Sequence, residues 1–373
     1  MKKIVFLCML LMCVACRPSE SVMKSLDASD IVLCYAGGAG GCMFDIGYMN
    51  DYVWYKDRDG NPDWLFDGFL LLQIRDIGDG ASEVAFDPGH KNKDGSILPA
   101  AAQADWMKLI DYYFEDGQCI DAIDKAVVEA TKILGAPPYK RQVVISIPNP
   151  IIYKQPLSKK GGTTYWGILD GKVTDFSKEE DRIAACRWFI DEVLERYGTG
   201  KWKHVELAGF YWITEETLDE SPLLPEVSAY LHSKGYPLTW IPYFEAPGYD
   251  GWKDKGFDAA WYQPNYFFND AIPYGRLETA CRQAMENGMA MEIEFDERVL
   301  SEPEWGDRSY GYRLRDYMQA FIDSGVWEKC PLAYYQSGSA VRDMKCSSDV
   351  ADRELYYDFC DFVAKRPYRN RVK

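Results

Sequence analysis

Residues Val205 to Glu216 have the sequence Val-Glu-Leu-Ala-Gly-Phe-Tyr-Trp-Ile-Thr-Glu-Glu. The stretch begins with apolar, β-prone residues and ends in two adjacent carboxylates, and a helix-like run follows at 223–234. In barrels of alternating strands and helices, the C-terminal ends of the strands deliver side chains to the active site. The stretch therefore predicts a barrel strand that carries an active-site carboxylate, although solvated acids in a turn would give the same pattern.

A second stretch, residues 289–298, has a related sequence, Met-Ala-Met-Glu-Ile-Glu-Phe-Asp-Glu-Arg. Side chains alternate across a strand, so Glu292, Glu294 and Asp296 share one face and the apolar residues share the other. The apolar face must pack against helices, which directs the acidic face into the barrel. Buried carboxylates are costly unless they are paired or hydrogen-bonded, so we favour a functional role for this column of acids over a packing role.

The rest of the chain alternates apolar runs with amphipathic segments, which predicts a single (β/α)8 TIM barrel over residues 29–373. A turn at 57–63, containing Asp-Gly and Asn-Pro, predicts a hairpin. The loops after strands 1, 2 and 3 are expected to be elaborated. The eight predicted strands lie at 30–36, 69–74, 142–147, from 205 onward, 238–245, 259–266, 289–295 and 332–336.

The N-terminus has the pattern of a targeting signal. Lys2 and Lys3 precede a short apolar run at 4–14, and Val14-Ala15-Cys16 resembles a bacterial lipobox. We expect a lipoprotein signal peptide at 1–15, lipidation of Cys16 and a tether at 16–28. The protein would then be exported and lipid-anchored to the cell envelope, at the outer membrane or the cell surface. An ordinary secretory signal is the alternative.

Charge and composition exclude several classes of function. A formal net charge of −16 repels phosphate backbones, so no nucleic-acid partner is expected. The three histidines lack metal-ligand spacing, and none of the eight cysteines after Cys16 forms a Cys-x-x-Cys pair, so neither a metal nor a cofactor is expected. A Ser-His-Asp triad would need His90, but no Gly-x-Ser-x-Gly elbow is present. Carboxylate chemistry remains, and glycoside hydrolysis proceeds with two carboxylates.

The predicted strand ends are rich in amides and aromatic rings, which suit a polyhydroxylated ligand such as a carbohydrate. Trp212, Tyr243 and Trp261 are interpreted as aromatic platforms. The residues predicted to bind the substrate are Tyr35, Gln73, Arg75, Asn149, Trp212, Tyr243, Glu245, Trp261, Gln263, Asn265, Tyr266 and Gln336.

Strand seven offers Glu294 as a catalytic residue, with Asp296 nearer the rim and Glu292 deeper as alternatives. In strand four the period of two does not decide between Glu215 and Glu216. If Glu215 is the acid, a neighbouring carboxylate, Glu216 or Glu245, is expected to raise its pKa by repulsion.

Carboxylates on strands four and seven resemble those of the large clan of retaining barrel glycosidases. That resemblance implies that the strand-four Glu is the general acid/base and that Glu294 is the nucleophile. Thr214 stands where those enzymes usually carry Asn.

Three further motifs resemble the secreted bacterial family catalogued as domain of unknown function 4855. They are Trp64-Leu65-Phe66-Asp67-Gly68-Phe69-Leu70, Gly209-Phe210-Tyr211-Trp212 with Glu215, and Trp261-Tyr262-Gln263-Pro264-Asn265. This resemblance covers most of the chain, implies a barrel in a carbohydrate context without an established reaction, and favours Glu215 over Glu216. A glycoside hydrolase acting on an oligo- or polysaccharide is therefore the leading hypothesis. A non-catalytic glycan-binding envelope lipoprotein is the alternative, and a structural or partner-binding envelope protein is a third possibility.

Overall fold

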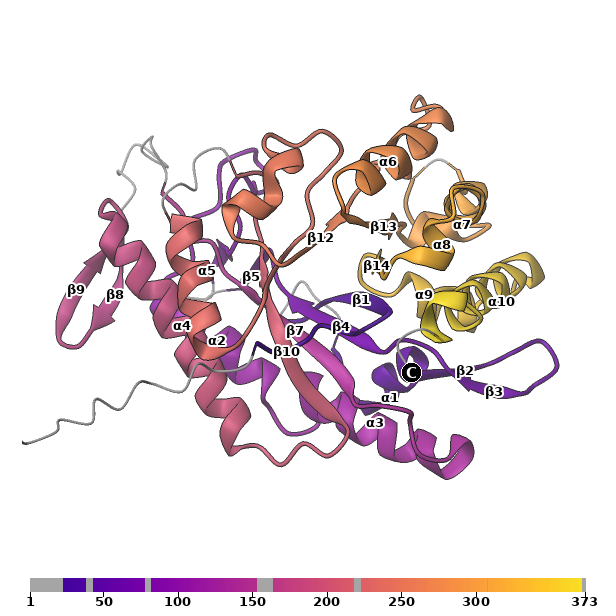
Figure 1. Cartoon of the computed structure of the whole chain (residues 1–373), viewed down its shortest axis with the longest axis horizontal. Helices are drawn as coiled ribbons and strands as arrows, with labels where there is room; N and C mark the ends of the chain where they lie inside the picture. Colours follow the sequence, from indigo (N-terminus) through magenta and orange to yellow (C-terminus); the bar gives the residue numbers. More distant parts are fainter. Residues whose placement is uncertain are drawn as a thin grey trace, which may run out of the picture.

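The computed structural model describes residues 23–37, 43–77, 82–152, 164–217, 223–306 and 308–370. Eight parallel strands close into a barrel in the order β1-β14-β13-β12-β11-β10-β7-β4, with helices around it (Figure 1). The predicted TIM barrel is confirmed. The predicted signal peptide and the lipidation site Cys16 lie outside the described residues.

The barrel strands are short and buried. The largest differences from the prediction are at β11 and β12, which end at Trp240 and Tyr262 instead of at residues 245 and 266. Beyond them, Glu245 and Asn265 have φ angles of 57° and 48°, outside the range of extended strands. The strands are β1 (Asp30–Tyr35), β4 (Gly68–Leu72), β7 (Arg141–Ile147), β10 (Val205–Trp212), β11 (Leu238–Trp240), β12 (Ala259–Tyr262), β13 (Ala290–Glu294) and β14 (Leu332–Tyr335).

Three antiparallel hairpins are inserted in the connections after β1, β4 and β7. The turn predicted at 57–63 is confirmed, since Trp54 pairs with Trp64 across it. In Figure 1 the first and third hairpins project from opposite sides of the barrel. The hairpins are β2 (Trp54–Lys56) with β3 (Pro62–Trp64), β5 (Arg75–Ile77) with β6 (Glu83–Ala85), and β8 (Tyr165–Leu169) with β9 (Lys172–Asp175).

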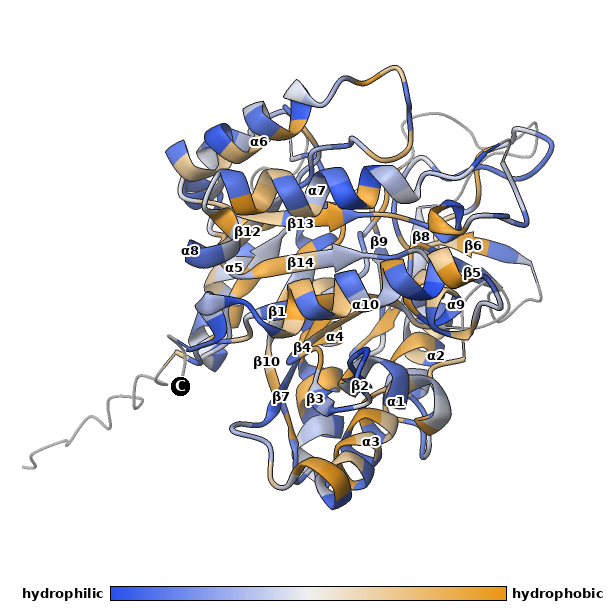
Figure 2. Ribbon diagram, turned by 90° about the vertical axis from the view of Figure 1, so that its right-hand side faces the viewer, coloured by the Kyte–Doolittle hydropathy of each residue, from blue (hydrophilic) through white to orange (hydrophobic). Residues whose placement is uncertain are grey.

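The surrounding helices bury an apolar strip and expose the rest of their surface, as amphipathic helices do (Figure 2). Within the described ranges, no helix combines the length and the apolar character needed to cross a membrane. The helices are α1 (Ile46–Val53), α2 (Gln103–Tyr113), α3 (Cys119–Leu134), α4 (Glu179–Thr199), α5 (Leu223–Lys234), η1 (Tyr249–Lys255), α6 (Gly275–Glu286), η2 (Glu297–Val299), α7 (Gly311–Asp323), α8 (Val326–Lys329), α9 (Ala340–Cys346), α10 (Val350–Ala364) and η3 (Pro367–Asn370).

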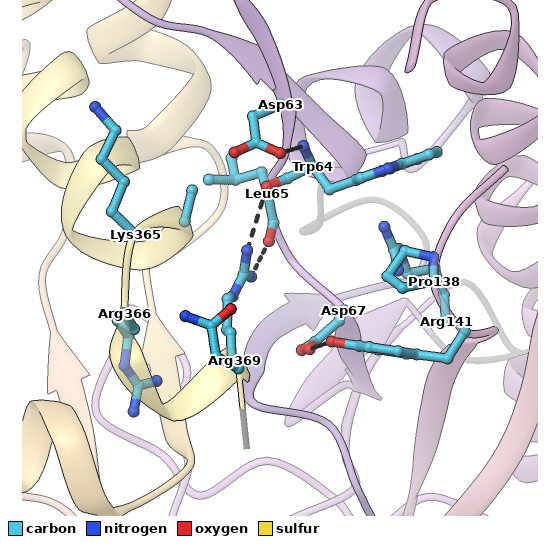
Figure 3. Close-up of a pocket in the computed structure, with 12 residues that line it drawn as sticks. Asp63, Trp64, Leu65, Asp67, Pro138, Arg141, Lys365, Arg366 and Arg369 are labelled. Carbon is cyan, nitrogen blue, oxygen red and sulfur yellow. Dashed lines mark hydrogen bonds between the residues drawn. The ribbon is translucent and has the colours of Figure 1, made fainter. Parts of the chain in front are cut away.

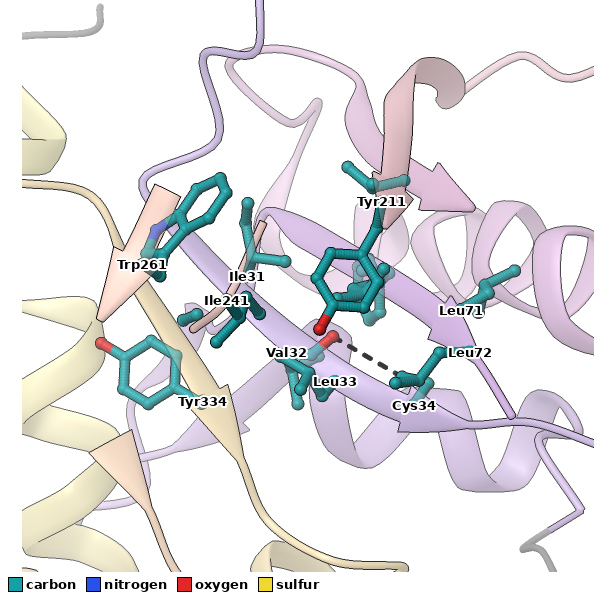
Figure 4. Close-up of a cluster of buried hydrophobic side chains, with 14 of the residues drawn as sticks. Ile31, Val32, Leu33, Cys34, Leu71, Leu72, Tyr211, Ile241, Trp261 and Tyr334 are labelled. Carbon is teal, nitrogen blue, oxygen red and sulfur yellow. Dashed lines mark hydrogen bonds between the residues drawn. The ribbon is translucent and has the colours of Figure 1, made fainter. Parts of the chain in front are cut away.

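Apolar side chains fill the part of the barrel interior that lies farther from the C-terminal ends of the strands. Ile31, Ile241 and Trp261 meet there around a void of about 10 Å³, too small to hold a ligand. Figure 4 shows Ile31, Ile241 and Trp261 gathered between the strands, with the Tyr211 ring beside them. The interior is therefore closed toward the N-terminal ends of the strands, and any ligand must enter from their C-terminal ends.

A buried ion network ties the C-terminal segment to the start of β1. Asp30 lies 2.5 Å from the Arg366 guanidinium and 2.6 Å from that of Arg369, and it accepts a hydrogen bond of 2.7 Å from the Tyr334 hydroxyl. Burial alone would raise the pKa of Asp30, but the two guanidinium groups outweigh it and hold the pKa below its ordinary value. In Figure 3, Arg369 also reaches the backbone around Leu65.

Candidate active site

A cavity of about 280 Å³ opens at the C-terminal ends of the barrel strands. This is the face at which TIM-barrel enzymes place their active sites, and the volume is close to the lower end of ordinary ligand pockets. The cavity is lined by Leu33, Tyr35, Leu72, Ile74, Asp87, His90, Tyr211, Ile213, Glu215, Gln263, Asn265, Phe268, Glu292, Glu294 and Tyr335.

Strand β10 brings Glu215 to the cavity through the alternation of its side chains. Tyr211, Ile213 and Glu215 line the cavity in steps of two residues along β10 and its continuation. Glu216 has the opposite parity and is not a lining residue. It accepts a hydrogen bond of 3.0 Å from the Tyr243 hydroxyl instead. The structure thus places Glu215, and not Glu216, in the cavity.

Strand β13 brings two of its three acids to the same cavity. Glu292 and Glu294 line it, whereas Asp296 lies beyond the end of the strand and pairs with the Arg298 guanidinium at 2.7 Å. Asp296 also accepts the Arg298 backbone N–H as the cap of helix η2. The expectation that all three acids share the inward face therefore holds for the two that lie within the strand.

Glu294 is held by three hydrogen-bond donors. Its carboxylate accepts from the Asn265 backbone N–H at 2.6 Å, the Tyr317 hydroxyl at 2.7 Å and the Asn265 side-chain amide at 3.3 Å. Asn265 presents both donors because its backbone is left-handed, a conformation that Asn adopts more readily than most residues. Burial raises the pKa of Glu294 to about 7, while the hydrogen bonds oppose that rise by stabilising the carboxylate.

Glu215 has a less polar environment. Within the described chain, its carboxylate accepts a single hydrogen bond, of 3.0 Å, from the Gln263 side-chain amide. Burial raises the pKa of Glu215 to about 7, and Asp87 adds repulsion. Glu216 contributes less than either, and Glu245 is not among the main causes. The predicted repulsion from Glu216 is therefore present, but desolvation has the larger effect on this pKa.

Glu292 lies deeper, with none of its surface exposed to solvent. Neither of its carboxyl oxygens has a hydrogen-bond partner among the described residues. Burial, with repulsion from Glu294 and Glu215, raises the pKa of Glu292 well above its ordinary value. Burial therefore disfavours the ionised form of the Glu292 carboxyl as long as no cation lies beside it.

Asp87 and His90 were missed as site residues by the sequence analysis. They come from the connection after β4, and the His90 Nε2 atom lies 3.2 Å from an Asp87 carboxylate oxygen. Asp87 also accepts a hydrogen bond of 3.2 Å from the Thr214 hydroxyl, which in turn accepts one of 2.7 Å from Asn149. The length of this connection was the available signal, but no motif marked either residue.

Tyr211, Phe268 and Tyr335 were also missed as lining residues, and so was Tyr317, which holds Glu294. Tyr211 lay within a quoted motif but was not interpreted as facing the site. Phe268 and Tyr317 lie outside the predicted strands, so alternation along a strand gave no indication of their positions.

Of the predicted substrate-binding residues, Tyr35, Gln263 and Asn265 line the cavity. Trp212 and Trp261 are 0% and 3% exposed, so their interpretation as aromatic platforms is wrong. The others also lie outside the lining: Arg75 pairs with Glu83, Glu245 accepts from Gln283, Tyr266 donates to Asp316, Gln336 accepts from Tyr52, Gln73 accepts from the Ile74 backbone, Asn149 donates to Thr214 and Tyr243 donates to Glu216.

The family model described as Domain of unknown function (DUF4855) matches residues 30–361. Among solved structures, the protein described as a "putative alpha-L-fucosidase" from Bacteroides thetaiotaomicron is 13% identical with a TM-score of 0.44, covering 97% of this chain and 98% of that chain. A family 18 chitinase from Crocus vernus is 11% identical with a TM-score of 0.41, covering 88% and 98%. Likenesses at this level carry no argument about function. No curated protein matches the chain.

Proposed function

This chain belongs to the DUF4855 family, whose description assigns no reaction, and from its cavity we propose that it is a glycoside hydrolase acting on an oligo- or polysaccharide. Glu215 would be the general acid/base and Glu294 the nucleophile. The proposal rests on two carboxyl groups from different strands that face one cavity at the C-terminal end of the barrel.

The observation that carries the proposal is the difference in hydrogen bonding between the two carboxyls. Glu294 accepts three hydrogen bonds, which favour its ionised form. Glu215 accepts one and lies beside the carboxylate of Asp87, an arrangement that favours its protonated form. Pairs of acids whose environments favour opposite protonation states are the usual acid and nucleophile of a glycosidase.

In the proposed reaction, the Glu294 carboxylate attacks the anomeric carbon as the bond to the leaving sugar breaks. Glu215 gives its proton to the departing oxygen. Glu215, now ionised, then takes a proton from water as that water attacks the anomeric carbon and releases Glu294. This sequence retains the anomeric configuration. An inverting reaction would instead place the water between the two carboxyls.

The test compares two single variants on natural and activated substrates. Glu294→Ala should abolish turnover, and added azide should restore it with a glycosyl azide product. Glu215→Ala should spare substrates with good leaving groups, because these need no proton. NMR of the first-formed anomer separates retention from inversion. Near wild-type rates in both variants would refute the assignment, and binding to a glycan array without new reducing ends would favour a glycan-binding protein.

We also propose that the protein is exported and lipid-anchored through Cys16. The segment that leads into β1 lies at the N-terminal ends of the strands. There the Ala28 backbone N–H donates to Gln142 at 2.8 Å and the Lys24 N–H donates to the Gly235 carbonyl at 2.8 Å. An anchor attached there would leave the cavity facing away from the membrane. Labelled palmitate should enter the wild-type protein and not Cys16→Ala, and equal labelling of the two would contradict the anchor.

A further inference from the structure

Glu292 is a buried acid that the proposed reaction does not use. Its side chain is fully buried, it lines the cavity, and both of its carboxyl oxygens lack a partner within the described part of the chain. Buried polar groups are costly unless they are hydrogen-bonded, and native structures leave few of them unsatisfied. Since Glu292 lines the cavity, a group bound in the cavity can supply the partner that the described residues do not.

The cavity around Glu292 is acidic. Glu215 and Glu294 lie close enough to raise its pKa by repulsion. Among the described lining residues, His90 is the one basic side chain, and it already faces the Asp87 carboxylate at 3.2 Å. No Lys or Arg appears among these lining residues. A cation from the ligand would therefore supply the charge that these described lining residues do not.

Aromatic rings complete the walls. Tyr35, Tyr211, Tyr335 and Phe268 line the cavity. The Tyr335 ring packs edge-on against both Tyr35 and Phe268, with centroids 5.5 and 5.7 Å apart. Aromatic faces attract ammonium groups, and an ammonium carries three hydrogen-bond donors and no acceptor. A site with carboxyl groups at its base and aromatic rings in its walls therefore matches an ammonium group.

We propose that the floor of the cavity binds an ammonium group of the substrate through Glu292, so that the preferred glycan contains an amino sugar without an N-acetyl group. The inference rests on the proposed glycan substrate, but it does not depend on hydrolysis. A hydroxyl at the same place would leave the acidic floor without a counter-charge. An N-acetyl group would bring a neutral amide that donates a single hydrogen bond.

The test measures binding of matched sugars by calorimetry. Glucosamine, galactosamine and mannosamine are each compared with the parent sugar and the N-acetylated form, as monosaccharides and as short oligosaccharides. At least one amino sugar should bind about tenfold more tightly than both counterparts, the difference of roughly one charge-assisted contact. In Glu292→Gln the preference should disappear while the affinity for the parent sugar stays the same. Glu286→Gln, an equal charge change at an exposed site on α6, should keep the preference.

Absence of an amino-sugar preference in the wild type, or its survival in Glu292→Gln, would overturn the proposal. A second measurement needs no ligand. Glu292→Met removes an unsatisfied acid at nearly the same volume, so the ligand-free protein should melt at a higher temperature. A lower melting temperature would mean that Glu292 has a structural role, which also overturns the proposal.

These outcomes separate the inference from the proposed function. A wild-type protein that prefers amino sugars but releases no reducing ends would contradict hydrolysis alone. One that hydrolyses neutral glycans without this preference would contradict only the role of Glu292.

Discussion

Replacing Asp30 with Ala should destabilise the barrel strongly. Asp30 is fully buried, and its carboxylate neutralises Arg366 and Arg369, whose side chains are 0% and 11% exposed. Removing it leaves two buried guanidinium groups without their counter-ion. Breaking a buried pair from one side costs about 3–5 kcal/mol, because the remaining charge is uncompensated. For about 350 residues, an unfolding entropy near 2.1 cal/mol/K per residue converts this into a melting temperature lower by about 4–7 °C.

Urea and thermal denaturation, followed by circular dichroism, measure the effect. The matched control is Asp116→Ala, which also breaks an ion pair, here with Lys125 at 2.7 Å, but at a side chain that is 92% exposed. The control should unfold with the wild-type midpoint, because exposed pairs contribute little. If Asp30→Ala unfolds within about 1 kcal/mol of the wild type, the assignment of this network as a stabilising element of the N-terminal face is wrong.

Four other predictions concern the cavity and the core. Because burial raises the pKa of both Glu215 and Glu294 to about 7 and the proposed mechanism needs one proton between them, kcat/KM should fall on both sides of neutral pH; a flat profile from pH 5 to 9 would contradict this. The same raised pKa values stabilise the folded state fully below pH about 4.5, and this stabilisation is lost as pH rises through about 7. Glu215→Gln should therefore flatten the pH dependence of the urea midpoint. Tyr317→Phe removes a donor that lowers the pKa of Glu294, so the acidic limb of the rate profile should move to higher pH without a shift of the alkaline limb. Trp261→Ala, which empties part of the barrel floor, should cost about 3–5 kcal/mol in urea unfolding, and a cost below about 1 kcal/mol would show that the floor is loosely packed.

The alternation of side chains allowed much of the architecture and part of the site to be predicted. Parity along β13 places Glu292 and Glu294 inside the barrel because a strand has only two faces. The same rule could have excluded Trp212, whose parity is opposite to that of Tyr211. The alternation does not, however, tell how far along the barrel axis a side chain lies. Trp261 shares the inward face with Gln263, but it lies one layer lower and forms part of the floor.

Contributions from connecting segments were beyond sequence reasoning. Asp87 and His90 reach the cavity from the connection after β4, and the path of that connection depends on tertiary contacts. Tyr317 reaches Glu294 from helix α7, where its position follows the buried face of an ordinary amphipathic helix. Helical periodicity predicts that such a side chain is buried. It does not predict that its hydroxyl meets a carboxylate on a strand.

Two buried acids of the barrel, Asp30 and Glu292, differ in whether the surrounding residues offer them partners. Asp30 and Glu292 are both 0% exposed. Asp30 has two guanidinium partners and a lowered pKa, whereas Glu292 has no partner in the described chain and a raised one. A packed barrel could hold an apolar side chain at position 292 at lower cost, as it does at Trp261. A costly group of this kind is usually kept where a ligand offsets its cost. The unsatisfied acid therefore argues that the cavity evolved to receive a polar group, and the acids around it argue that this group is positively charged.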